Sequence, residues 1–149
     1  PPRSTLFPYT TLFRSAPNLA APRKRMLSSM SPTILTRDGQ VFLVLGSPGG
    51  RSIINTVLQV ILNVIDHRME LPAAVAALRL HHQWFPDRIQ FERGALTPPS
   101  QAELAGRGHA LVEQESPQGA VMAIRFNAAQ DVLEGVADPR AGDGGARGW

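Results

Sequence analysis

The sequence predicts an α+β fold in which the helices are segregated from a mostly antiparallel sheet. Segments of strand type come first, helical segments follow, and segments of strand type return at the end, unlike the regular alternation of a doubly wound parallel sheet. Hydrophobic residues make up 43% of the 149 residues, a share that suits a globular core. The chain has no cysteine, so it has no disulfide framework, no thiolate zinc site and no cysteine nucleophile.

The first 15 residues are expected to be foreign to the fold. The run from Thr5 to Ser15 resembles the translation of a DNA sequencing adapter, and such a segment is excluded from fold reasoning. We therefore expect residues 1–15 to be a disordered artefact and residues 16–149 to be a C-terminal fragment. Leaving out Arg3 and Arg14 lowers the basic count from 15 to 13 against 12 acidic residues, so the net charge falls from +3 to +1.

Residues 33–45 are predicted to form a β-hairpin, because Asp38-Gly39 lies between two β-rich runs. The segment Gly46-Ser47-Pro48-Gly49-Gly50, called the glycine turn below, follows this hairpin. A helix is predicted from Ile53 to about His67, with apolar residues over more than one face. Such a wide apolar stripe predicts burial against a sheet or between elements.

The remaining elements follow from turn residues and apolar periodicity. They are a helix over 73–79, a loop over 80–87, a short strand over 89–92, a helix from Thr97 to about 106 or 108, and strands over 109–113, 120–126 and 131–136. Pro72 suits the first turn of its helix, and the last two strands form a hairpin around 127–130. No run reaches the roughly 18 apolar residues that a membrane span needs, so no span is expected.

The glycine turn predicts a site for negative charge. Two adjacent glycines let the backbone approach a ligand closely, and the first turn of the next helix adds unpaired N–H groups and the positive end of its dipole. Such a site holds an anion or a transition-state oxyanion. The turn lacks the Gly-Lys-Ser/Thr ending of a nucleotide-binding P-loop. A purely structural turn and a phosphate site both remain open at this point.

Ser28 and Ser29 belong to a hydroxyl cluster that strand pairing could bring alongside the glycine turn. They could be nucleophiles, ligands or turn residues. A serine nucleophile needs a base within hydrogen-bond reach, whereas two hydroxyls that hold a carboxylate need no base.

Three other groups have simpler structural interpretations. The side chains of His81 and His82 point in opposite directions on an extended segment, so a histidine packed against Trp84 is favoured and no metal or cofactor is expected. Asp138-Pro139-Arg140 predicts a local ion pair at a turn. The basic triplet at 23–25 has no aromatic stacking platform, so no nucleic-acid partner is expected.

Five motifs occur in a fixed order: Ser28-Ser29-Met30-Ser31-Pro32-Thr33-Ile34, Gly46-Ser47-Pro48-Gly49-Gly50, Thr56-Val57-Leu58-Gln59, His81-His82-Gln83-Trp84 and Asp138-Pro139-Arg140. This combination resembles the γ-glutamyltranspeptidase family, whose members are also called glutathione hydrolases. The match runs from about residue 16 to 149 and resembles the C-terminal part of that family's small subunit. The serine pair and the glycine turn are specific together, although neither would be alone.

The resemblance implies an N-terminal nucleophile hydrolase, of which this chain would supply part of a four-layer αββα sandwich. Family precursors cleave themselves, and the new N-terminal threonine attacks the γ-glutamyl amide of substrates such as glutathione. Water, an amino acid or a peptide then takes up the glutamyl group. By motif position, Ser28 and Ser29 would hold the glutamyl α-carboxylate, and the backbone N–H groups of Gly49 and Gly50 would stabilise the oxyanion.

The resemblance also places the nucleophilic threonine outside this chain, so we expect the chain alone to be inactive although its parent is an enzyme. It implies a heterodimer with the large subunit of the same precursor and a parent that is periplasmic or secreted. Arg51-Ser52 departs from the Ser-Arg usual in the family, and Leu78 stands where the family has proline. The alternatives are an acylase of the same fold that cleaves cephalosporin side chains, and a non-catalytic binding module.

Overall fold

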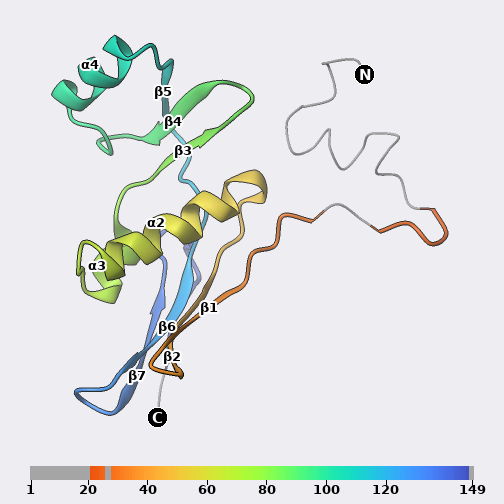
Figure 1. Ribbon diagram of the computed structural model, residues 1–149, viewed down its shortest axis with the longest axis vertical. Helices are drawn as coiled ribbons and strands as arrows, with labels where there is room; N and C mark the ends of the chain where they lie inside the picture. The colour runs from red at the N-terminus through yellow and green to blue at the C-terminus, as the bar shows by residue number, and fades with distance from the viewer. Residues whose placement is uncertain (1–20, 26–27, 148–149) are drawn as a thin grey trace.

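The computed structural model describes residues 21–25 and 28–147 (Figure 1). The predicted artefact at 1–15 lies outside the described residues and stays a prediction. The elements are β1 (Thr33–Arg37), β2 (Gln40–Gly46), the short 3-10 helix η3 (Gly50–Ser52), α2 (Ile53–Ile65), α3 (Leu71–Ala76), β3 (Leu80–Gln83), β4 (Arg88–Glu92), α4 (Pro98–Gly106), β5 (Leu111–Gln114), β6 (Met122–Asn127) and β7 (Val132–Ala137).

Four strands form an antiparallel sheet in the order β1-β2-β6-β7. The predicted hairpin at its start is confirmed, since Asp38 (φ 52°) and Gly39 (φ 79°) both have positive φ, as a tight two-residue hairpin turn requires. The predicted hairpin around 127–130 joins β6 to β7. Because both hairpins close at the same end of the sheet, the glycine turn that follows β2 lies at the other end (Figure 1).

Helices α2 and α3 cover one face of this sheet (Figure 1). The core between them contains fully buried side chains such as Leu43 of β2, Val60 of α2 and Leu71 of α3. The prediction for α2 is confirmed almost to the residue. Helix α3 begins earlier and ends earlier than the predicted 73–79, because the chain turns to an extended conformation at Ala77 (ψ 142°).

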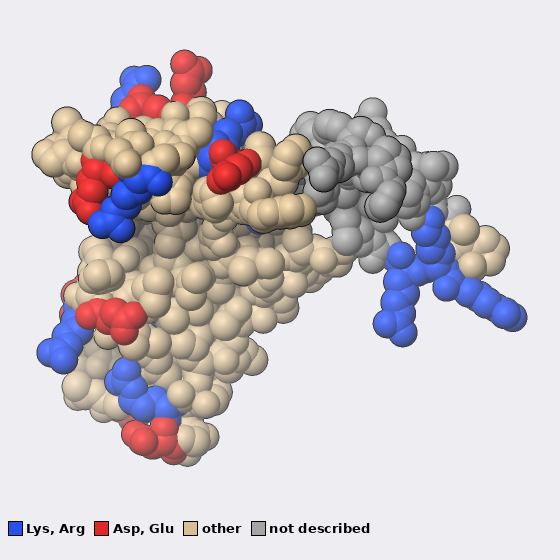
Figure 2. Space-filling view, turned by 45° about the horizontal axis from the view of Figure 1, so that its top comes forward, with Lys and Arg blue, Asp and Glu red and all other residues tan. Residues whose placement is uncertain are grey.

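Two apolar faces of this unit are left open. On the sheet, Ile34 pairs with Val44 and Val44 with Ile124, so these three side chains share the face opposite the helices, and all three are exposed. On α2, the outward side exposes Ile54, Leu58, Leu62 and Ile65. The helix contains no charged residue, and Figure 2 shows a broad area without Lys, Arg, Asp or Glu across the middle of the molecule.

A second sheet lies beyond the glycine-turn end of the first, with the order β3-β4-β5 (Figure 1). The predicted loop over 80–87 is wrong for its first half, since β3 pairs antiparallel with β4 over 80–83. The sequence of this segment, rich in ring side chains, does not predict a strand, and the strand forms because it pairs with β4. Strand β5 runs parallel to β4, and α4 connects the two as parallel strands require. The Thr97 side chain caps α4 by accepting a hydrogen bond from the Ser100 N–H at 3.3 Å.

Among the described residues, no helix has the length and apolar character that crossing a bilayer demands.

Candidate active site

The glycine turn has a backbone that other residues could not adopt at low cost. Gly49 has φ 137° and Gly50 has φ 57°. A Cβ atom on Gly49 would lie 2.9 Å from the Ser52 hydroxyl oxygen and 3.4 Å from the Gly119 Cα. The positive φ therefore favours glycine at position 49, and the Ser52 hydroxyl would have to shift to admit a Cβ atom there.

Hydroxyl groups within and beside the turn hold its shape. The Ser52 N–H and hydroxyl donate to the Gly49 carbonyl at 3.2 and 2.9 Å. The Ser47 hydroxyl donates to the Pro48 carbonyl at 2.7 Å and accepts from the Ala120 N–H at 3.0 Å. In the part of the chain that the structure describes, the N–H groups of Gly49 and Gly50 donate to no acceptor. They remain available to a bound negative charge.

Arg51 and Ser52 lie where the helix begins. The chain makes one turn of 3-10 helix over Gly50–Ser52 before α2 begins, and α2 has no side-chain cap, because the Ser52 hydroxyl is used on Gly49. The N–H groups of Gly49 and Gly50 take no part in this helix start.

The serine pair lies against the glycine turn, as predicted from strand pairing. Thr33 pairs with Leu45, so the segment before β1 runs beside the segment after β2. The Ser29 hydroxyl donates to the Gly50 carbonyl at 2.9 Å. The exposed Ser28 hydroxyl accepts from the Met30 N–H at 3.2 Å, which leaves its own proton free to donate. The two serines therefore differ: Ser29 is tied to the turn, and Ser28 is free to bind.

A cavity of about 470 Å³ lies at the glycine turn, between the two sheets. Glycine, serine, proline, arginine, histidine and glutamine residues line it, and no Asp or Glu does; the residues are Gly49, Gly50, Arg51, Ser52, His81, Gln90, Gln114, Ser116, Pro117, Gln118 and Gly119. Gln118 and Gly119 were not singled out in the sequence. The sequence pattern that could have indicated them is Pro-x-Gly at 117–119, just before a strand, which repeats the Pro-x-Gly of the glycine turn at 48–50.

His81 of β3 is buried in this lining and has both ring nitrogens engaged. The Asn55 side-chain amide donates to the His82 carbonyl at 2.9 Å and, from the same nitrogen, to His81 Nδ1 at 3.1 Å. His81 Nε2 lies 3.0 Å from Gln83 Oε1, whose amide nitrogen donates to the Phe85 carbonyl. These partners assign the proton to Nε2. Burial, together with nearby Arg51, lowers the pKa of His81, so the ring is neutral.

The predicted packing of a histidine against Trp84 is wrong. Trp84 is 80% exposed and lies beside Phe85, with ring centroids 6.5 Å apart. His82 instead meets His109 edge to face at 6.3 Å and contacts Asp87 Oδ1 at 3.0 Å. Within the described ranges, no three His, Cys, Asp or Glu side chains are grouped to hold a metal ion.

The ion pair predicted in Asp138-Pro139-Arg140 is confirmed and belongs to a larger buried network. Arg140 Nη1 lies 3.1 Å from Asp138 Oδ1. The other Asp138 oxygen pairs with Arg79, which is 1% exposed, and Arg140 also pairs with the buried Glu92 at 2.6 Å. Arg79 and Glu92 were missed as functional partners because they lie 59 and 46 residues from Asp138 along the chain.

This network holds the segment that backs the glycine turn. Glu92 Oε1 accepts from the Gln118 N–H at 2.8 Å, and Arg79 donates to the Gln118 carbonyl at 2.7 Å. The adjacent Gly119 is packed so closely that a Cβ atom there would lie 2.7 Å from the Ser47 hydroxyl oxygen. Buried charged groups therefore hold the 117–119 turn to strand β4, and close packing at Gly119 holds that turn against the glycine turn.

The two carboxylates of the network are stabilised in their charged form. Burial opposes ionisation of Asp138, but hydrogen bonds from the Arg140 and Val121 N–H groups and the ion pairs with Arg79 and Arg140 outweigh it and lower the pKa of Asp138. Burial likewise opposes ionisation of Glu92, and the Arg140 side chain with two backbone N–H donors lowers the pKa of Glu92. Both groups are therefore carboxylates near neutral pH.

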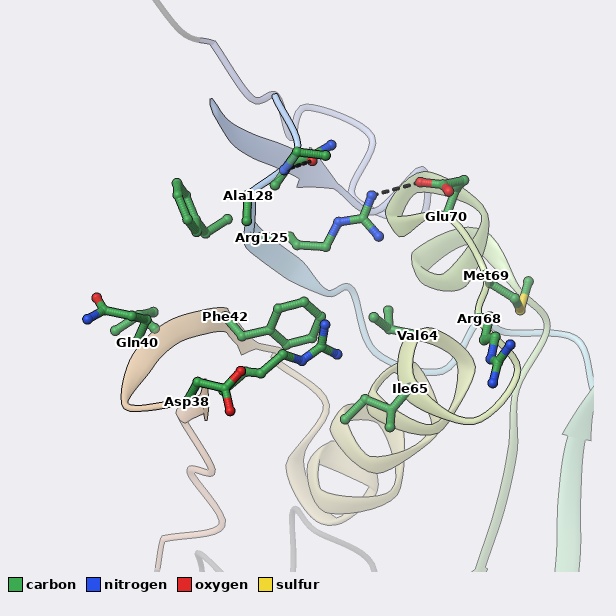
Figure 3. A pocket seen from close by; sticks show the side chains of 15 residues that line it. Asp38, Gln40, Phe42, Val64, Ile65, Arg68, Met69, Glu70, Arg125 and Ala128 are labelled. Carbon is green, nitrogen blue, oxygen red and sulfur yellow. Dashed lines mark hydrogen bonds and ion pairs between the residues drawn. The ribbon is translucent and has the colours of Figure 1, made fainter. Parts of the chain in front are cut away.

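A larger cavity, of about 720 Å³, lies at the hairpin end of the first sheet (Figure 3). Arg125 extends from β6 toward Glu70 and binds it at 2.7 Å, and Arg37 lies 3.9 Å from the centre of the Phe42 ring. None of the predicted site residues lines this cavity. A large volume is no evidence for a reactive site. The smaller cavity is the one lined by Gly49 and Gly50.

Comparison with known proteins identifies relatives of this chain. A family model described as gamma-glutamyltranspeptidase matches residues 5–148. A glutathione hydrolase proenzyme of Escherichia coli is 42% identical over 126 residues, which are 85% of this chain and 21% of that protein. A glutathione hydrolase proenzyme of Pseudomonas aeruginosa is 45% identical over 125 residues, which are 83% of this chain and 22% of that protein. The chain thus spans about a fifth of these relatives' length.

The three-dimensional comparison agrees. A solved gamma-glutamyltranspeptidase of Pseudomonas nitroreducens superposes with a TM-score of 0.74 at 46% identity, covering 91% of this chain and 68% of that chain. The predicted α+β class and partial N-terminal nucleophile hydrolase fold are confirmed.

Proposed function

This chain belongs to the γ-glutamyltranspeptidase family, and from that premise we propose that its glycine turn and serine pair form part of a site that cleaves a γ-glutamyl amide such as that of glutathione. The observation that carries the proposal is the hydrogen bond from the Ser29 hydroxyl to the Gly50 carbonyl, which joins the two motifs. A carboxylate binder and an oxyanion stabiliser must lie close together to act on one small substrate.

The hydrogen bonds of the glycine turn and the serine pair indicate a different role for each group. The free N–H groups of Gly49 and Gly50 stabilise the oxyanion of the tetrahedral intermediate. Ser28 donates its uncommitted hydroxyl proton to the glutamyl α-carboxylate, while Ser29 fixes the turn or rotates to add a second donor. A threonine hydroxyl from another part of a longer precursor attacks the amide carbon, and the amine leaves. Water or an amine then releases the glutamyl group from the threonine ester.

We propose that the open apolar faces bind the rest of that precursor as a heterodimer. Ile34, Val44 and Ile124 form an exposed row on the sheet, and the outer side of α2 carries no charge. Such apolar surfaces suit burial on both sides of the layer. The proposal includes a self-cleaving parent that works in the periplasm or outside the cell. Glycine, serine and backbone groups need no metal or cofactor for this chemistry.

A chimera tests the proposal. Residues 28–147 replace the matching segment of the Escherichia coli relative, and hydrolysis of a γ-glutamyl anilide is measured. We expect a self-processed, active chimera whose activity falls at least about 100-fold in Gly49→Ala, because the Cβ atom and the positive φ would move the Gly49 N–H away from the oxyanion. The isolated chain is expected to release no aniline.

The matched control is Gly39→Ala, a positive-φ glycine at the hairpin end with no atom within 4 Å of the added Cβ. A processed chimera in which both variants keep full activity would contradict the role of the glycine turn. If the chimera does not assemble, binding of L-glutamate by the isolated chain decides the question, since the serine pair and both glycines lie within it. Failure to bind contradicts the proposal.

A further inference from the structure

The carbonyl groups of the glycine turn determine where its free N–H groups point. A peptide unit is planar, and in the trans form its N–H points opposite to its carbonyl. The Pro48–Gly49 and Gly49–Gly50 units are both trans. A group that holds the Pro48 carbonyl therefore orients the Gly49 N–H. In the same way, a group that holds the Gly49 carbonyl orients the Gly50 N–H.

One serine hydroxyl holds each of these two carbonyls. The Ser47 hydroxyl donates to the Pro48 carbonyl at 2.7 Å, and the Ser52 hydroxyl donates to the Gly49 carbonyl at 2.9 Å. A carbonyl oxygen can only accept, so the single proton of each hydroxyl is committed to the turn. Each serine therefore acts on a free N–H group through the peptide unit that carries it.

Ser47 is also anchored outside the turn. Its oxygen accepts from the Ala120 N–H at 3.0 Å, across 73 residues of chain. The backbone N–H of nearby Gln118 donates to Glu92 at 2.8 Å, whereas the Gln118 side-chain oxygen has no hydrogen-bond partner among the described residues. The backbone of this segment is thus tied to the buried charged network, and Ser47 extends that tie to the Gly49 N–H.

Ser52 acts over a shorter path. Its backbone N–H donates at 3.2 Å to the same Gly49 carbonyl that its hydroxyl holds. Loss of the Ser52 hydroxyl therefore leaves one of the two bonds in place. Loss of the Ser47 hydroxyl takes this donor from the Pro48 carbonyl and this acceptor from the Ala120 N–H, so the larger effect is expected at Ser47.

We propose that Ser47 and Ser52 are positioning residues for the cleavage of the γ-glutamyl amide. Ser47 directs the Gly49 N–H toward the oxyanion of the tetrahedral intermediate. Ser52 directs the Gly50 N–H toward the same oxygen. This assignment rests on the function proposed above. Donors that are oriented before the reaction need no reorganisation when the negative charge develops, and this preorganisation gives them their catalytic effect.

The first test measures the direction of each N–H bond by NMR, from residual dipolar couplings in the isotope-labelled 149-residue chain. Ser47→Ala should change the coupling of the Gly49 N–H most. Ser52→Ala should change the coupling of the Gly50 N–H most. Couplings that stay unchanged at both glycines would overturn the proposal.

Ser29→Ala is the matched control for this measurement. The Ser29 hydroxyl holds the Gly50 carbonyl at 2.9 Å, and the N–H of that peptide unit belongs to Arg51. The largest change in this variant is therefore expected at the Arg51 N–H. The same pattern of changes in all three variants would show a general loosening of the turn and would overturn the proposal.

The second test uses the chimera and the γ-glutamyl anilide described above. Ser47→Ala should lower kcat about tenfold, less than the roughly 100-fold expected when a whole donor is displaced. KM should stay within about twofold, because the oriented donors act on the transition state rather than on the bound substrate. Ser52→Ala should lower kcat about threefold, since one bond to the Gly49 carbonyl remains.

Ser100→Ala makes the same change in the first turn of α4 and should leave kcat and KM unaltered. An unchanged kcat in Ser47→Ala, or a rise in KM alone, would overturn the positioning role. The proposed function would then still stand, provided that Gly49→Ala abolishes activity. Full activity in Gly49→Ala would overturn the proposed function and the positioning role together.

Discussion

The two ends of the four-stranded sheet are built on opposite principles. At the glycine-turn end, buried charged groups fix a tight backbone around a small cavity: Asp138 and Arg79 are each 1% exposed. At the hairpin end, the larger cavity is bordered by an ion pair between Arg125 and Glu70, whose carboxylate side chain is 79% exposed. The hairpin end has the larger cavity, whereas the glycine-turn end has the buried charged groups. Chemistry is expected where the backbone is fixed, because preorganised donors need a rigid support.

The largest expected difference between the ends concerns their ion pairs. Asp138→Ala leaves the Arg79 guanidinium buried without its partner, and loss of one member of a buried pair costs about 3–5 kcal/mol. Glu70→Ala breaks an exposed pair, for which about 0–1 kcal/mol is typical. Urea denaturation of both variants measures the free energy of unfolding. Equal losses would show that the buried network does not distinguish the two ends.

A smaller difference is expected for two glycines. Gly49→Ala places a Cβ atom 2.9 Å from the Ser52 hydroxyl oxygen at a φ that alanine rarely adopts, so we expect a loss of about 1–3 kcal/mol. Gly39→Ala also has positive φ, but its Cβ meets no neighbour within 4 Å. Thermal denaturation should rank Gly49→Ala below Gly39→Ala, and the opposite order would contradict the packing described at the glycine turn.

Acid should weaken the glycine-turn network. The folded-state pKa values of Asp138 and Glu92 are lowered from the ordinary values of 3.8 and 4.5. The unfolded chain therefore binds more protons in this range, and the free energy of unfolding falls as pH falls below about 5 toward the folded values. The stabilisation is fully present above the ordinary values. Urea denaturation between pH 7 and 3 measures the decline, and a flat profile would contradict the charged network.

The smallest expected effect concerns the bond between the two motifs. Ser29→Ala removes the hydrogen bond to the Gly50 carbonyl, worth about 0.5–1.5 kcal/mol. Ser28→Ala should leave stability nearly unchanged, since Ser28 is exposed, yet weaken binding of L-glutamate more than Ser29→Ala does. Denaturation and glutamate titration of the two variants separate the roles. A larger stability loss in Ser28→Ala would reverse the assignment.

Local signals predicted the first half of this fold well. Asp38-Gly39 specifies its turn through backbone conformations that those two residues tolerate, and α2 follows from an apolar period that spans 13 residues. Strand pairing through that hairpin also brings Ser29 beside the glycine turn, which the sequence predicts as possible. Each of these inferences depends on residues near one another in the chain.

Non-local contacts explain what was missed. Strand β3 exists because it pairs with β4, while its own sequence, Leu80-His81-His82-Gln83, has neither regular apolar alternation nor strong strand formers. Arg79 and Glu92 form ion pairs with residues more than 40 positions away, and no spacing rule predicts these pairs. The unpaired oxygen of Gln118 is visible only once the chain packs around it.

The most direct measurement of the central claim is an NMR titration of the labelled chain with γ-glutamylglycine. We expect shifts at Ser28, Ser29, Gly49 and Gly50, and no shifts around Asp38 or Ala128 at the hairpin end. Shifts confined to the hairpin end, or none at the glycine turn at saturating ligand, would contradict the assignment of the γ-glutamyl site.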